Sequence, residues 1–122
     1  MKTKVEINEM VEHIESLKKD WLKTPMDKGK ASALKLTILS FLNIQKPKLL
    51  KYETESLSIK CALIDLEDAI NYLETYSESK RIKKDDGYFV DAKNKIECAC
   101  DDIVKFYKSL LAKTDNLLSP FY

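Results

Sequence analysis

Apolar residues recur at helical spacing along most of this chain, and the longest such stretch runs from Leu49 to Tyr76. It contains about 28 residues without Gly or Pro, so nothing in it interrupts a helix. One set of its apolar positions forms a heptad series, and a second set lies beside it: Tyr52, Ile59, Leu63, Leu66, Ile70 and Leu73, with Leu50, Leu57, Cys61 and Ile64. The combined arc is wider than a two-stranded seam needs. The pattern predicts one helix of about 40 Å that several other helices must cover.

The N-terminal stretch has the pattern of a helix start. Thr3 and Glu6 have the spacing of a capping box, in which each side chain accepts a hydrogen bond from a backbone N–H group of the first turn. The pattern predicts a helix over about residues 4–23. Its apolar face consists of Val5 or Ile7, Met10, Val11, Ile14, Leu17 and Trp21.

A second helix start follows at once. Thr24 is a capping residue, and Pro25 is tolerated at the first helical position because its missing N–H group has no helical partner there. Gly29 weakens this first turn by about 1 kcal/mol relative to Ala. The helix is therefore expected to begin at Thr24, or to become regular only near Ala31.

The end of this second helix is predicted from Pro47. A residue before proline avoids the helical region, so we expect the helix to end near Asn43 or Ile44. Pro47 is equally suitable as the first residue of the next helix. The apolar face of the second helix is Leu34, Ile38, Phe41 and Leu42, flanked by Leu36 and Leu39.

The composition changes after Tyr76 to a run rich in Ser, Lys and Asp. The pair Asp86-Gly87 favours a type I′ turn, which predicts a short β-hairpin or a loop over about residues 77–90. A last helix is expected from about Asp91 and should pair with residues 49–76. Its apolar positions alternate in steps of three and four: Phe89, Ala92, Ile96, Ala99, Ile103, Phe106 and Leu110.

These elements predict an all-α fold. We expect residues 1–122 to form a single helical domain, a mostly antiparallel four-helix bundle with the hairpin of the last two helices as its spine. The composition agrees, because the chain has only two Gly and three Pro residues and is 44% hydrophobic and 34% charged. A hairpin longer than the helices that cover it would leave apolar surface near one end.

The composition also bears on the compartment. The three cysteines are an odd number, and the start of the chain has no apolar segment typical of a signal peptide. Both features indicate a cytoplasmic protein. The longest nearly uncharged apolar run, residues 36–44, is too short to cross a bilayer, so no membrane association is expected.

Candidate catalytic chemistry is sparse. His13 is the single histidine, so no second imidazole is present to activate a Cys or Ser nucleophile or to complete a carboxylate-bridged metal site. Cys98 and Cys100 are two residues apart, which places them on opposite sides of a helix. We therefore predict no enzyme activity, no cofactor, no metal and no small-molecule substrate.

Charge is unevenly distributed. Residues 17–51 contain nine lysines and two acids, whereas residues 55–78 contain six acids and one lysine. One interpretation is that these segments pair with each other across the bundle. The other is a basic region that meets nucleic acid or an acidic partner. The candidate contact residues are Lys80, Arg81, Lys83 and Lys84 in the expected turn, Lys46, Lys48 and Lys51 between the second and third helices, and Phe121 and Tyr122 in the apolar tail.

The second half of the chain contains a distinctive order of short pieces. They are the Leu-, Tyr- and acid-rich segment 49–76, Gly87-Tyr88-Phe89-Val90, Ala92-Lys93-Asn94-Lys95, the helix over 103–111, and Leu118-Ser119-Pro120. In these pieces the chain resembles the small terminase subunits of tailed phages. The Asn-Pro pair usual in that family is absent. The resemblance implies a ring-forming oligomer that recognises viral DNA and delivers it to a large motor subunit.

Two functions follow as hypotheses. The first is a non-enzymatic interaction module, an inhibitor, adaptor or assembly factor typical of phages and mobile elements. It would bind a protein partner or further copies of itself through an apolar helical face with a Lys-rich rim. The alternative is an oligomeric DNA-binding protein of the small-terminase kind.

Overall fold

The computed structural model describes residues 4–52, 56–79 and 86–118. In these ranges the chain forms four α-helices and one 3-10 turn, with no β-strand. The elements are, in chain order, α1 (Lys4–Leu22), α2 (Lys28–Leu49), η1 (Leu50–Tyr52), α3 (Leu57–Glu78) and α4 (Asp86–Leu118). The predicted all-α class and the number of helices are confirmed.

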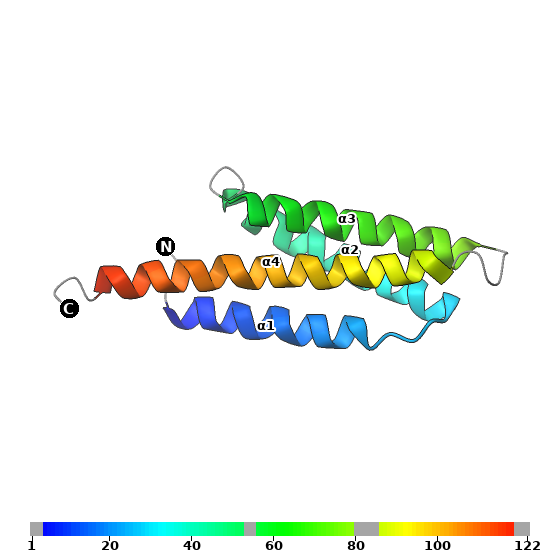
Figure 1. Ribbon diagram of the computed structural model, residues 1–122, viewed down its shortest axis with the longest axis horizontal. Coiled ribbons are helices and arrows are strands. Elements are labelled where there is room, and N and C mark those ends of the chain that lie inside the picture. Colours follow the sequence, from blue (N-terminus) through cyan, green and yellow to red (C-terminus); the bar gives the residue numbers. More distant parts are fainter. Residues whose placement is uncertain (1–3, 53–55, 80–85, 119–122) are drawn as a thin grey trace.

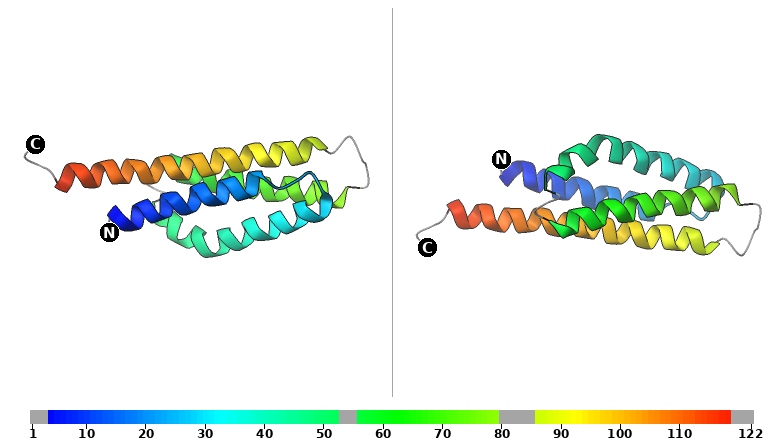
Figure 2. Two further views of the ribbon diagram at one scale, coloured as in Figure 1. Left: turned by 90° about the horizontal axis from the view of Figure 1, so that it is seen from below. Right: turned by 90° about the horizontal axis from the view of Figure 1, so that it is seen from above.

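Each helix runs antiparallel to the one before it, and the four form an elongated bundle (Figures 1 and 2). The central pair is α3 and α4, as predicted. The two outer helices pack on different members of this pair: α1 packs mainly on α4, whereas α2 packs mainly on α3. The C-terminal end of α4 extends beyond the ends of the other helices (Figure 1).

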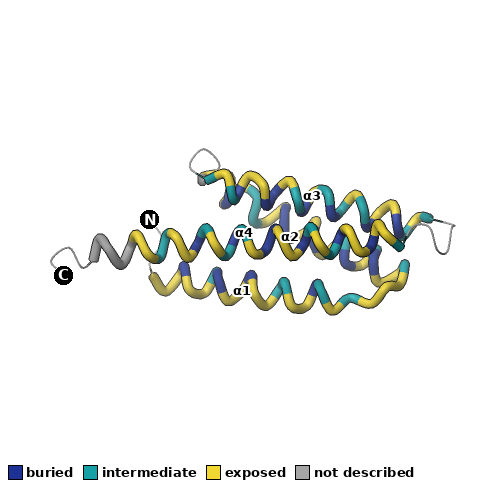
Figure 3. Tube along the Cα trace, in the orientation of Figure 1, coloured by how far each residue is buried: buried dark blue, intermediate teal, exposed yellow. Residues whose placement is uncertain are grey.

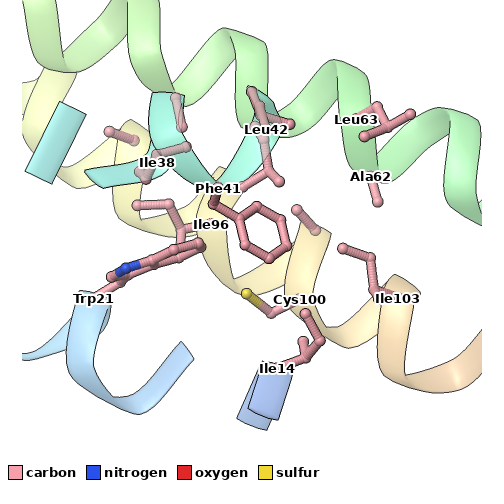
Figure 4. Packing of buried hydrophobic residues seen from close by; sticks show 14 of the residues in the cluster. Ile14, Trp21, Ile38, Phe41, Leu42, Ala62, Leu63, Ile96, Cys100 and Ile103 are labelled. Carbon is pink, nitrogen blue, oxygen red and sulfur yellow. The ribbon is translucent and has the colours of Figure 1, made fainter. Parts of the chain in front are cut away.

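The core is formed by the inward faces of all four helices (Figure 3). Side chains from every helix meet in its middle, among them Trp21, Phe41 and Ile96 (Figure 4). Four alanines are fully buried where α3 and α4 pack together: Ala62, Ala69, Ala92 and Ala99. Their small side chains allow the two helix backbones to approach closely. None of the helices in the described ranges is long and apolar enough to span a bilayer.

The predicted end of the second helix was wrong, because α2 continues through Pro47 to Leu49. Pro47 removes one helical hydrogen bond, the one to the carbonyl of Asn43. Both residues are exposed, so water can satisfy that carbonyl. The helix then closes with a hydrogen bond from the Leu50 N–H group to the Lys46 carbonyl.

Both predicted starts of this helix were also wrong. The cap is Asp27, whose carboxylate accepts a hydrogen bond from the Lys30 N–H group at 2.9 Å. The Thr24 N–H group instead donates to the Trp21 carbonyl at 3.2 Å and closes α1. Thr24 therefore belongs to the end of one helix, and the next begins four residues later at Lys28.

The helix predicted over residues 49–76 is shorter than expected. It begins at Leu57, where the Ser56 hydroxyl caps the first turn by accepting from the Ile59 N–H group at 3.4 Å, and it extends to Glu78. The longest helix is α4, with 33 residues.

The predicted type I′ turn at Asp86-Gly87 was wrong, because both residues lie in the first turn of α4. The predicted strand residues beside it are helical as well. Tyr88 stacks on Tyr72 of α3 at 6.1 Å between ring centroids, and Phe89 packs on Tyr76 at 5.2 Å. These ring contacts favour helical backbone at the start of α4 over the local turn preference. Residues 77 and 78 of the expected hairpin belong to α3, and residues 80–85 lie outside the described residues.

Candidate functional site

The predicted contact residues do not gather on one surface in the part of the chain that the structure describes. Lys46 faces α3, where its Nζ lies 2.7 Å from Glu67 Oε1. Lys48 is exposed two residues further along α2, which places it on the opposite side of the helix. Lys51 is exposed in η1. The remaining predicted contact residues lie outside the described ranges: Lys80, Arg81, Lys83, Lys84, Phe121 and Tyr122.

The residues considered for catalysis or metal binding are dispersed. His13 and Cys98 are exposed, whereas Cys100 is buried. The two cysteines therefore lie on opposite sides of α4, as predicted. Burial raises the pKa of the Cys100 thiol to about 12, aided by the nearby charge of Asp101, so this group stays protonated and unreactive. No group of three or more His, Cys, Asp or Glu residues within the described ranges could hold a metal ion.

The bundle interior offers little polar chemistry. Among the described residues, no charged, amide or Ser/Thr side chain is buried, so the polar atoms of the core belong to side chains such as Tyr76, Tyr107 and Cys100. One polar atom of a half-buried residue, Gln45 Oε1, is enclosed without a hydrogen-bond partner. A binding function must therefore use the outer surface, where the charges and the remaining apolar side chains lie.

The charge asymmetry persists in the folded helices. The α2 helix carries five lysines and no acid, and α3 carries five acids and one lysine. Some of these charges pair across the bundle. Lys46 of α2 pairs with Glu67 of α3. Lys95 of α4 lies 3.4 Å from Asp65 and 3.7 Å from Asp68. The Lys46–Glu67 pair agrees with the interpretation that the two segments neutralise each other, whereas Asp65 and Asp68 pair with a lysine of α4.

A shallow groove runs along the outside of α2 and α3. Its volume is about 350 Å³. It is lined by Leu39, Leu42, Asn43 and Lys46 from α2, and by Glu67, Ile70 and Asn71 from α3. The apolar floor and the four polar residues on its rim resemble the composition of a surface that receives another helix.

This groove belongs to a longer surface that we call the outer face. On α2 and the turn after it, the outer face contains Leu36, Leu39, Asn43, Lys46 and Leu50, which are spaced by three and four residues. On α3 it contains Leu57, Ile64, Glu67 and Asn71. Its five large apolar side chains are exposed, from 38% at Leu50 to 74% at Leu57. Such 3-4 spacing is the pattern of a helix seam, here on the side that no helix of the described bundle covers.

The outer face was missed in the sequence, although its residues were noted. Leu36 and Leu39 were predicted to flank the core face, and Leu57 and Ile64 were included in the apolar arc that other helices should cover. In the structure these side chains stay exposed. The 3-4 series from Leu36 to Leu50 was the pattern that could have revealed it.

A second apolar groove lies where α1 ends beside the start of α4. It has a volume of about 420 Å³, and Met26 and Val90 on its edge are 47% and 48% exposed. Only these two exposed large apolar residues belong to it, against five on the outer face. The outer face is therefore the stronger candidate for a partner.

Comparisons of this chain with protein-family models, with curated proteins and with solved structures find no match. The function must therefore be inferred from the surface itself.

Proposed function

We propose that this protein is a non-enzymatic interaction module that binds a protein partner through the outer face of α2 and α3. The observation that carries the proposal is the set of five exposed Leu and Ile side chains on these two helices and the turn after α2. Exposed apolar surface mixed with a few polar groups is characteristic of protein interfaces. Asn43, Lys46, Glu67 and Asn71 supply these polar groups.

The same proposal includes a cytoplasmic location. All three cysteines are free thiols in the structure, and a reducing compartment keeps thiols in this state. DNA binding of the small-terminase kind remains the alternative prediction. Of the described cations on which it depends, Lys46 is paired with Glu67, whereas Lys48 and Lys51 are exposed. The pairing of Lys46 with an acid supports the protein-binding proposal over the alternative.

In-cell photo-crosslinking tests the proposal directly. A benzophenone amino acid replaces Leu39 on the outer face, and, in a control protein, Val5 on α1. Both side chains are exposed, at 41% and 65%, so neither substitution fills the core. We expect irradiation to link a protein to position 39 and not to position 5. No adduct at position 39, or the same adducts at both positions, would overturn the proposal.

A further inference from the structure

We propose that the partner of the outer face is a second copy of this chain, placed so that α2 of each copy lies on α3 of the other. The twofold axis of this dimer runs parallel to the helices. The inference rests on the proposed function, because it names the occupant of the same surface. Four observations carry it: the charges of the two helices, the positions of their polar residues along the bundle axis, the positions of two apolar residues along that axis, and the size of the face.

The charges of the two helices select this arrangement. Two twofold operations can bring the outer face onto its own copy. An axis across the helices stacks α2 on α2 and α3 on α3, so that Lys46 faces the basic helix of the other copy and Glu67 faces the acidic one. An axis along the helices stacks each basic α2 on the acidic α3 of the other copy. Like charges placed opposite one another oppose association, so the second arrangement is favoured.

The polar residues of α2 and α3 lie at matching heights, that is, at the same positions along the bundle axis. The ion pair between Lys46 and Glu67 places these two residues at one height, and Asn43 and Asn71 line the same groove one turn away. An axis parallel to the helices preserves height. Lys46 of one copy then lies above Glu67 of the second copy, and Asn43 above Asn71. Amides that pair within an apolar seam fix its register, which is the role of a single Asn in coiled coils.

Two apolar residues of the outer face, Leu50 and Ile64, also lie at matching positions along the bundle axis. Leu50 lies one turn beyond Lys46 on the first helix, and Ile64 lies one turn before Glu67 on its antiparallel neighbour. The two residues therefore lie at the same position along the bundle axis. In the dimer Leu50 of each copy would lie above Ile64 of the other. Both are exposed in the single chain, at 38% and 49%. Their mutual burial supplies a favourable apolar contact at this end of the face.

The size of the face suits a reversible dimer. Its residues 36–50 and 57–71 each span about 22 Å. Side by side the two segments form a surface about 20 Å wide, or roughly 450 Å² per copy. A dimer would bury about 900 Å² in total, the size of a weak and reversible interface.

The first test is the mass of the purified protein by sedimentation equilibrium over a range of concentrations. We expect an equilibrium between the 14.1 kDa chain and a species of twice that mass. Leu36→Ser or Ile64→Ser should raise the dimer dissociation constant about tenfold or more. Val90→Ser is the matched control, because Val90 is similarly exposed but lies on another surface, and it should leave the constant unchanged. Helical circular dichroism and Trp21 emission verify that each variant is folded.

The second test distinguishes the two axes. In a Cys61→Ser, Cys98→Ser background, a chain carrying Asn43→Cys is mixed with a chain carrying Asn71→Cys and then oxidised. The proposed axis predicts a disulfide between the two different chains. A disulfide formed chiefly between identical chains, or none, would overturn the arrangement.

The outcomes separate this inference from the proposed function. A strictly monomeric protein whose position 39 crosslinks to a different protein overturns the dimer and leaves the interaction module standing. A monomer with no crosslink overturns both. A dimer weakened by Val90→Ser and not by Leu36→Ser contradicts the assignment of the dimer to the outer face.

Discussion

The indole of Trp21 on α1 meets the ring of Phe41 on α2 edge-on, with 5.5 Å between the ring centroids and 84° between their planes. Both side chains are buried. The two helices otherwise pack chiefly on different neighbours, α1 on α4 and α2 on α3. This aromatic pair therefore joins the two outer helices of the bundle (Figure 4).

Shortening Phe41 to Leu should loosen this connection. Phe41→Leu keeps an apolar side chain but removes the ring edge that Trp21 contacts, which should lower the free energy of unfolding by about 1.5 kcal/mol. Urea titration followed by circular dichroism measures this change. Emission of the folded protein should shift to longer wavelength, because Trp21 is the only tryptophan and loses part of its cover.

Phe89→Leu is the matched control. Phe89 is also buried, and its ring packs on Tyr76 of α3. This variant should also be less stable, yet its folded-state emission should equal that of the parent protein. Equal emission shifts in both variants would contradict the local role of the Trp21–Phe41 contact.

The start of α2 can be tested with two alanine substitutions. Asp27→Ala removes the carboxylate that accepts from the Lys30 N–H group and should cost about 1 kcal/mol of stability. Thr24→Ala should cost much less, because the Thr24 backbone, and not its hydroxyl, closes α1. Thermal or urea unfolding of both variants measures the difference. A larger loss of stability for Thr24→Ala would indicate that Thr24 caps the helix, as the sequence alone predicted.

The apolar periodicity predicted which faces form the core but not where helices end. Ile38 and Phe41 were correctly expected inside, because their spacing matches the turn of a helix whatever its neighbours are. Helix ends depended on contacts distant in sequence. Local preference at Asp86-Gly87 favoured a turn, whereas the rings of Tyr72 and Tyr76 on α3 stabilise helical backbone just beyond it.

The outer face shows a second limit of the sequence. The apolar residues of α3 cover so wide an arc that periodicity cannot say which stripe is buried. Leu63 and Leu66 are buried, while Leu57 and Ile64 on the same helix are exposed. The choice depends on the positions of α2 and α4, which pack on α3 from other segments of the chain. A candidate site defined by uncovered side chains therefore requires the fold.

Gly87 offers a direct test of the start of α4. Its φ angle is negative, as for every glycine in the described residues, and an added Cβ would meet nothing within 4 Å. Gly87→Ala should therefore stabilise the protein by about 0.5 kcal/mol, because alanine restricts the unfolded chain. A type I′ turn would give the opposite sign, since it needs a positive φ at this residue.

Gly29→Ala serves as the comparison for this substitution. Gly29 also lies in a first helical turn, but its added Cβ would lie 3.3 Å from Asp27 Oδ1, the capping oxygen. The gain should be smaller than at Gly87, because the cap must shift to make room. Thermal unfolding of both variants measures the ranking, and a loss of stability for Gly87→Ala would contradict the helical assignment.

The three thiols should differ in reactivity. Cys61 and Cys98 are exposed, whereas burial raises the pKa of Cys100 to about 12. Only a thiolate attacks a disulfide reagent, so at neutral pH two thiols should react quickly and the third only when the protein unfolds. Ellman's reagent measures the number and rate. Cys100→Ala should leave two fast thiols, and three thiols of equal rate in the parent protein would contradict the burial of Cys100.

The stability of the bundle should depend on the charge of Asp102. Burial raises the pKa of its carboxyl, and the nearby charge of Asp65 adds to this effect. The folded state therefore holds this proton more tightly than the unfolded chain does. Above the folded-state pKa the ionised carboxylate lowers stability, and the loss disappears as the pH falls below the unfolded value of about 3.9.

Asp102→Asn removes this penalty and should be more stable than the parent protein at pH 7. The advantage should shrink toward pH 3.5, where both side chains are neutral, and urea unfolding at the two pH values measures it. Asp101→Asn is the neighbouring control. Asp101 accepts a hydrogen bond from Lys18 at 2.7 Å, which raises the pKa of that lysine, so its replacement should not stabilise the fold at pH 7. If the parent protein were more stable than Asp102→Asn at pH 7, the carboxylate would be favourably paired. That result would contradict the prediction that burial destabilises its ionised form.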